Sequence, residues 1–115
     1  MKIDLTKGIL DIKGTPTMVS EGSPFTLRDT LLVLLNGALV TPKESFSIPD
    51  LGKLIADESV MEIDSDTLGA KKLDLLRRVV KSNRGYPDKS GQYTPYPPII
   101  HVQVMKAVGL TEDDV

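Results

Sequence analysis

The stretch from residue 65 to residue 81, SDTLGAKKLDLLRRVVK, decides the fold class of this chain. At about 100° per residue, its apolar side chains fall within an arc of about 160°, and its charged side chains fall on the opposite side. Ser65 suits the N-cap and Asp66 the first turn, where the helix dipole favours an acid. The pattern predicts one long amphipathic helix whose buried face holds Leu68, Leu73, Leu75, Leu76, Val79 and Val80.

Three further helices are predicted around it. Thr26-Leu27-Arg28-Asp29 has the form of a capping box, and the run from Leu27 to Leu35 is apolar on nearly all sides, which is typical of a core helix or of a helix shared with an interface. Gly37 should end this helix in a left-handed cap, and Pro42 should break the chain after it. Ser47-Ile48-Pro49-Asp50 predicts an N-cap and a helix over 48–57, with Ile48, Leu51, Leu54 and Ile55 on its buried stripe. Pro97-Pro98 predicts a last helix over 99–108 that closes at Gly109 in a Schellman ending.

The first 20 residues indicate extended structure. Ile3 and Leu5 flank Asp4, and Leu10 and Ile12 flank Asp11, at the spacing of half-buried strands. The turn residues of 13–16 predict a hairpin whose second arm returns over 17–19, and 60–63 reads as a short extended piece. We therefore expect an α+β fold that is mostly helical, with a small N-terminal β-hairpin packed on about four helices. One domain should span 1–115, with the hairpin in 1–20, the helical part in 26–110 and an acidic tail in 111–115.

Composition excludes several classes of protein. The 115 residues include no cysteine, so disulfide frameworks and thiolate metal sites are excluded. Charged residues interrupt the N-terminal stretch, and the longest apolar run is far too short to cross a bilayer, so we expect an intracellular protein without a signal peptide or membrane span. The formal net charge is −2, which argues against a strong general affinity for nucleic acid.

Catalytic motifs are not apparent in the sequence. The single histidine, His101, has no nucleophile or orienting partner nearby in the chain. Helix capping accounts for Asp29, Asp50 and Asp66, the acids around 57–66 lack the spacing of a calcium loop, and no glycine-rich phosphate loop occurs. We therefore expect a non-enzymatic protein without cofactor or metal.

The distribution of charge singles out one surface. Residues 71–89 hold seven basic and two acidic side chains, and they run into a loop over 83–97 that is rich in glycine, proline and tyrosine and long for a structureless connection. This surface admits three interpretations, which are a solvated helix face, a contact with an acidic protein, and a nucleic-acid site that pairs phosphates and stacks bases. The candidate partner-binding residues are Arg77, Arg78, Lys81, Arg84, Tyr86 and Tyr93.

Several segments together resemble small proteins of tailed bacteriophages and prophages whose function is unknown. The resemblance is carried by MKIDLTKGILDIKGTP at the start, TLRDTLLVLL, VMEIDSDTL and YPPIIHVQVMKAV. The longer insert over 81–95 and the doubled Pro97-Pro98 depart from the group's pattern. The resemblance implies a source and no catalytic residues.

Taken with this source, the sequence favours a phage-encoded protein-binding accessory protein that acts in the cytoplasm of the infected host cell, as an assembly factor or an inhibitor of a host process. Its partner would be a phage or host protein. One alternative is a nucleic-acid-binding module that uses the basic helix face. Another is an oligomeric virion component whose subunits meet through the Leu27–Leu35 helix.

Overall fold

Helices take up well over a third of the chain, so the predicted α+β, mostly helical class is confirmed. The computed structural model describes residues 1–20 and 22–115. Their helices are α1 (Leu27–Asn36), α2 (Pro42–Ser45), α3 (Ile48–Ala56), α4 (Ser65–Leu68), α5 (Ala70–Ser82), α6 (Pro98–Ala107) and the 3-10 helix η1 (Glu112–Asp114). The strands are β1 (Lys2–Asp4), β2 (Met18–Ser20), β3 (Ser23–Pro24), β4 (Glu62–Asp64), β5 (Tyr86–Pro87) and β6 (Tyr93–Thr94), in three antiparallel pairs.

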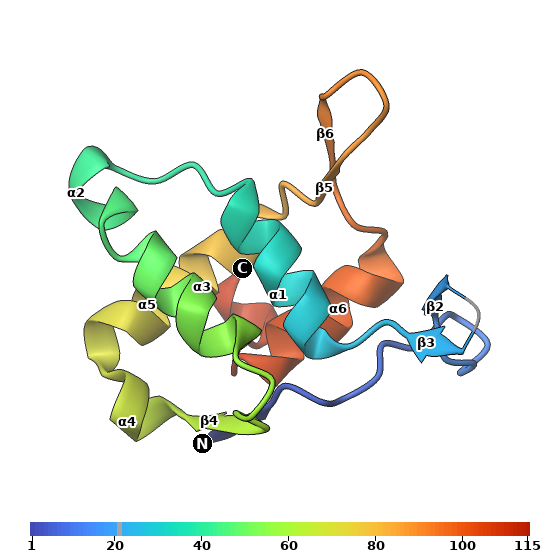
Figure 1. Cartoon of the computed structure of the whole chain (residues 1–115), viewed down its shortest axis with the longest axis horizontal. Coiled ribbons are helices and arrows are strands. Elements are labelled where there is room, and N and C mark those ends of the chain that lie inside the picture. The colour runs from blue at the N-terminus through green and yellow to red at the C-terminus, as the bar shows by residue number, and fades with distance from the viewer. Residues whose placement is uncertain (21) are drawn as a thin grey trace.

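Helix α1 lies at the centre of the fold, in contact with α3, α5 and α6 (Figure 1). The predicted capping box is present, because Thr26 accepts a hydrogen bond from the Asp29 amide while the Asp29 carboxylate accepts from the Thr26 amide. Four leucines of the helix, Leu27, Leu31, Leu34 and Leu35, are buried. The core of the same chain therefore covers these four leucines, and the subunit interface expected on the Leu27–Leu35 helix stays a prediction.

The helix predicted from Ser65 to Lys81 is two helices. Gly69, with φ of 90°, ends α4 and precedes α5, and the residue that caps α4 is Asp64 rather than Ser65. A positive φ is open to glycine without steric cost, which is why the break falls there. The predicted apolar arc is confirmed on both sides of the break, since Leu68, Leu75, Leu76, Val79 and Val80 are buried.

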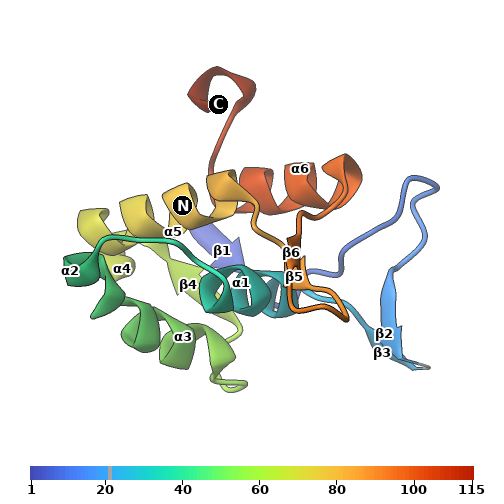
Figure 2. The ribbon, with the colours of Figure 1, turned by 90° about the horizontal axis from the view of Figure 1, so that it is seen from above.

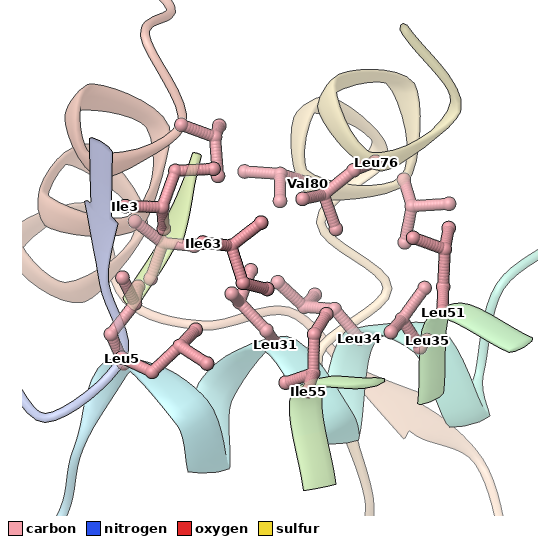
Figure 3. Packing of buried hydrophobic residues seen from close by; sticks show 14 of the residues in the cluster. Ile3, Leu5, Leu31, Leu34, Leu35, Leu51, Ile55, Ile63, Leu76 and Val80 are labelled. Atoms are coloured by element: carbon pink, nitrogen blue, oxygen red, sulfur yellow. The ribbon is translucent and has the colours of Figure 1, made fainter. Parts of the chain in front are cut away.

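One cluster of buried aliphatic side chains joins the helices to the first strand pair. Figure 3 shows side chains from α1, α3 and α5 converging with Ile3 of β1 and Ile63 of β4. On α3, Leu51 and Ile55 are buried, but Leu54 faces solvent, so the predicted stripe is narrower than expected. Its N-terminus also differs, because Ser47 has helical backbone angles and makes no side-chain cap. Ser47 directly follows the turn of α2, a short helix with its own Thr41–Glu44 capping box where only a break at Pro42 was predicted.

The N-terminal β-structure differs from the prediction in its pairing. Strand β1 pairs with β4, with Ile3 opposite Ile63, so residues far apart in the sequence form the ribbon that docks on the core. The predicted turn is present, because Leu10 and Pro16 form an antiparallel bridge and the Gly14 amide donates to the Asp11 carbonyl. Strands β2 and β3 then pair with each other. In Figure 2 residues 10–20 and β3 project from the helices, and we call residues 10–20 the N-terminal arm.

The segment after α5 and the end of α6 lie toward the C-terminus. The loop predicted over 83–97 contains the β5–β6 hairpin, so strands are not confined to the two places expected. The last helix ends as predicted, in a Schellman motif in which the Leu110 amide donates to the Met105 carbonyl and Gly109 has φ of 86°.

Candidate interaction surface

The basic face of α5 is engaged mainly within the chain. Arg78 forms ion pairs with Glu44 of α2 and with Asp74, whose Oδ2 lies 2.9 Å from its Nε. The hydrogen bond from Arg78 lowers the pKa of Glu44 to about 2 and raises the pKa of Arg78 itself. The pair with Glu44 links α5 to α2. Because two carboxylates lie beside the guanidinium, Arg78 offers little net positive charge to a partner.

Arg77 is hydrogen-bonded within the chain, whereas Lys81 is not ion-paired among the described residues. The Arg77 Nε donates to the Val108 carbonyl at 2.8 Å, which joins α5 to the end of α6. Lys81 is exposed, and the described residues give it no ion pair. Of the three candidate cations on α5, Lys81 is therefore the one most available to another molecule.

Arg84 and Tyr93 are brought together at the base of the β5–β6 hairpin. The Arg84 guanidinium carbon lies 4.7 Å from the centre of the Tyr93 ring, and its Nε donates to the Gly37 carbonyl at 2.9 Å. A Cβ at residue 37 would lie 2.4 Å from Cε1 of Tyr93, so glycine is required for this approach. The predicted left-handed conformation is wrong, since Gly37 has φ of −97°. The hairpin is thereby fixed to the C-terminal end of α1.

A second set of contacts fixes the other side of the hairpin base. The Asn83 side-chain amide donates to the Tyr96 carbonyl at 3.0 Å and accepts from the Tyr96 amide at 2.9 Å. Tyr96 is buried beside Tyr86, with ring centres 5.6 Å apart, and burial raises its pKa to about 12. Gly85 has φ of 72°, and a Cβ there would lie 1.8 Å from the Thr94 carbonyl oxygen. The predicted loop is thus a rigid protrusion that holds Tyr86 and Tyr93 half-exposed.

Exposed apolar side chains occur between α1 and α3, in the 37–41 connection and directly after α2. Phe46 is 84% exposed and Leu39 is 75% exposed. Phe46 forms a shallow depression of about 580 Å³ with Val40, Pro42 and Pro49. The sequence analysis missed these residues, although the signal was present, since neither Leu39 nor Phe46 belongs to the apolar stripe of any predicted helix.

The 37–41 segment joins these two features along one border of the molecule. It begins at Gly37, which contacts the hairpin base, and ends at the N-cap of α2 (Figure 1). We call the resulting set of large exposed or half-exposed side chains, Leu39, Phe46, Tyr86 and Tyr93, the apolar edge. Isolated apolar side chains are normal on protein surfaces, whereas contiguous exposed apolar patches mark interaction sites. The contiguous part of the apolar edge is the depression that Phe46 forms with Val40, Pro42 and Pro49.

The remaining candidates for chemistry have structural roles. His101 Nε2 lies 2.8 Å from the Val80 carbonyl oxygen and so links α6 to α5. In residues 1–20 and 22–115, no group of three histidine, cysteine or acidic side chains is placed to hold a metal ion. The longest helix described has 13 residues, which is too short to cross a bilayer.

No protein-family model, curated protein or solved structure matches the chain. Function is therefore inferred from the residues themselves.

Proposed function

We propose that this chain is a non-enzymatic protein-binding domain whose contact surface is the apolar edge. The observation that carries the proposal is the exposure of Phe46 and Leu39, large apolar side chains that the core of the chain leaves in water. Aromatic side chains on rigid supports supply much of the binding energy in protein interfaces, because they bury a large area and lose little conformational freedom. The partner therefore presents an apolar surface to this edge.

The resemblance to small phage proteins supports the infected bacterial cell as the setting in which this chain binds its partner. A phage-encoded domain without catalytic groups acts by occupying a surface of another protein, either a phage protein during assembly or a host protein whose activity it blocks. The working compartment is then the cytoplasm of the infected cell. Arg84 adds positive charge beside Tyr93 of the apolar edge, which suits a partner with acidic residues around its apolar contact.

Nucleic-acid binding is the weaker proposal. Arg77, Arg78 and Arg84 each donate to an acceptor of the chain itself. The Nε hydrogen bonds of Arg77 and Arg84 restrict how their guanidinium groups can turn toward a phosphate, and the carboxylates that accept from Arg78 repel one. The basic face is therefore better described as a set of helix-to-helix contacts with Lys81 at its exposed end.

An affinity capture with matched variants tests the proposal. Immobilised chain is exposed to a nuclease-treated extract of infected bacteria, and the captured proteins are compared among the unmodified chain, Phe46→Asp and Met61→Asp. Met61 is a matched control because it is exposed and lies at the β4 side of the fold. We expect Phe46→Asp to lose a protein that Met61→Asp retains. If the two variants capture the same proteins in the same amounts, Phe46 does not lie in the interface.

A further inference from the structure

The N-terminal arm carries an apolar side chain that its own chain leaves uncovered. Ile12 is 84% exposed, and it lies between Asp11 and Lys13 on the segment that projects from the body in Figure 2. The base of the arm is fixed, because the Gln103 side-chain amide of α6 accepts from the Leu10 amide at 2.9 Å and donates to the Leu10 carbonyl at 2.7 Å. The arm is therefore held away from the core rather than folded onto it.

The same chain has an apolar groove of matching chemistry. A depression of about 440 Å³ lies between α6 and the C-terminal segment, and its walls are Val102, Met105, Leu110 and Val115. Val102 is 40% exposed, although it lies on a helix whose other side is buried in the core. Two charged side chains, Lys106 and Glu112, also line the groove.

The charges on the arm and in the groove are complementary. On the arm, an acid precedes Ile12 and a base follows it, whereas the groove offers one base and one acid. With Ile12 in the groove, Asp11 can face Lys106 and Lys13 can face Glu112. The described residues give none of these four side chains an ion pair within the chain. Opposite charges at the margin of an apolar contact fix its orientation and speed association.

We propose that the occupant of the groove is a second copy of this chain, and that two chains exchange their arms about a two-fold axis. One Ile12 contact is smaller than the roughly 800 Å² per partner that a standard stable interface buries. A two-fold arrangement uses the contact twice and closes the assembly at two subunits. This interface involves no residue of the apolar edge, so it is independent of the proposed partner contact.

Sedimentation of the purified full chain over a concentration series up to about 1 mM tests the dimer. We expect the unmodified chain to pass from monomer to dimer, and Ile12→Asp and Val102→Asp to remain monomeric with unchanged circular dichroism. Leu39→Asp alters an aliphatic side chain of the apolar edge that, like Ile12, is largely exposed, and this variant should dimerise normally. Lys13→Glu should weaken the dimer, and adding Glu112→Lys to that variant should restore it.

Mixing the two monomeric variants tests whether the contact forms between chains. Ile12→Asp keeps an intact groove and Val102→Asp keeps an intact arm, so an equimolar mixture can form one of the two contacts. We expect the mixture to associate, more weakly than the unmodified chain because one contact forms in place of two, although neither variant associates alone. A monomer at every concentration, dimerisation unaffected by Ile12→Asp, or a mixture that stays monomeric would each overturn the proposal.

Discussion

At the scale of single residues, glycines hold the hairpin base in place. Gly85 and Gly91 both have positive φ, but a Cβ at residue 85 would clash with the Thr94 carbonyl while a Cβ at residue 91 would meet open space. Gly37 is required for a different reason, because the Tyr93 ring occupies the space that a Cβ would take. The position of the hairpin part of the apolar edge therefore requires glycine at residues 37 and 85, where a Cβ would clash.

Gly85 and Gly91, which both have positive φ, give a matched test. Both Gly85→Ala and Gly91→Ala incur backbone strain, which costs about 1–3 kcal/mol. Gly85→Ala adds a steric clash, so it should lower the melting temperature more than Gly91→Ala does. Equal melting temperatures would mean that the close approach to Thr94 is not maintained in solution.

The Glu44–Arg78 pair predicts a dependence of stability on pH. The folded-state pKa of Glu44 lies at about 2, below its ordinary value of 4.5. The contribution of Glu44 to the free energy of unfolding is therefore fully present above pH 4.5 and is lost as pH falls through about 2. The unfolding free energy of the unmodified chain should exceed that of Glu44→Gln by a small amount at neutral pH, since the pair is partly exposed. This difference should vanish through that acidic window in urea titrations. Arg78→Gln should reduce the same pH dependence, since Thr41 still donates to Glu44, and a difference that does not decrease between neutral pH and pH 2 would contradict the assignment.

At the scale of elements, α5 supplies Leu75, Leu76, Val79 and Val80 to the core. Leu76 is buried in the core, and truncation of a buried leucine costs about 2–5 kcal/mol. Leu76→Ala should therefore lower the free energy of unfolding by that amount in urea titrations. The control is Leu54→Ala on α3, where the leucine is exposed and the loss should be much smaller. Equal losses would show that the two leucines are not distinguished by burial.

Local patterns in the sequence predicted the elements better than their pairing. The capping box at Thr26 and the apolar arc around Leu76 depend on residues close in the chain, and both are confirmed. The pairing of β1 with β4 is set by the shared core under Ile3 and Ile63, which no local pattern encodes. The break at Gly69 was missed because helical periodicity continues across it.

The candidate site shows the same division. The sequence placed Arg84 and Tyr93 in one region, and the structure joins them at the hairpin base. It missed the internal acceptors of Arg77 and Arg78, since the Val108 carbonyl and Glu44 come from segments about 30 residues away. It also missed Phe46, because exposure becomes visible only when the core is complete.

At the scale of the whole molecule, α1 to α6 form one body from which the N-terminal arm, the β5–β6 hairpin and the C-terminal segment project (Figure 2). The β5–β6 hairpin extends the border that carries the apolar edge, and the N-terminal arm extends another part of the surface (Figures 1 and 2). The hairpin is fixed by Arg84 and Asn83, so a partner that binds the apolar edge meets a preformed surface. Such a surface binds without a large ordering cost.

Site-specific photo-cross-linking in infected cells tests the central claim, that the apolar edge contacts a protein, most directly. A photoreactive phenylalanine analogue replaces Phe46 in one chain and Met61 in a control chain, and both positions are exposed. We expect light to join a protein to the chain labelled at position 46 and to leave the chain labelled at position 61 without that product. Cross-linked products that are the same from both positions, or no protein product from position 46, would contradict it.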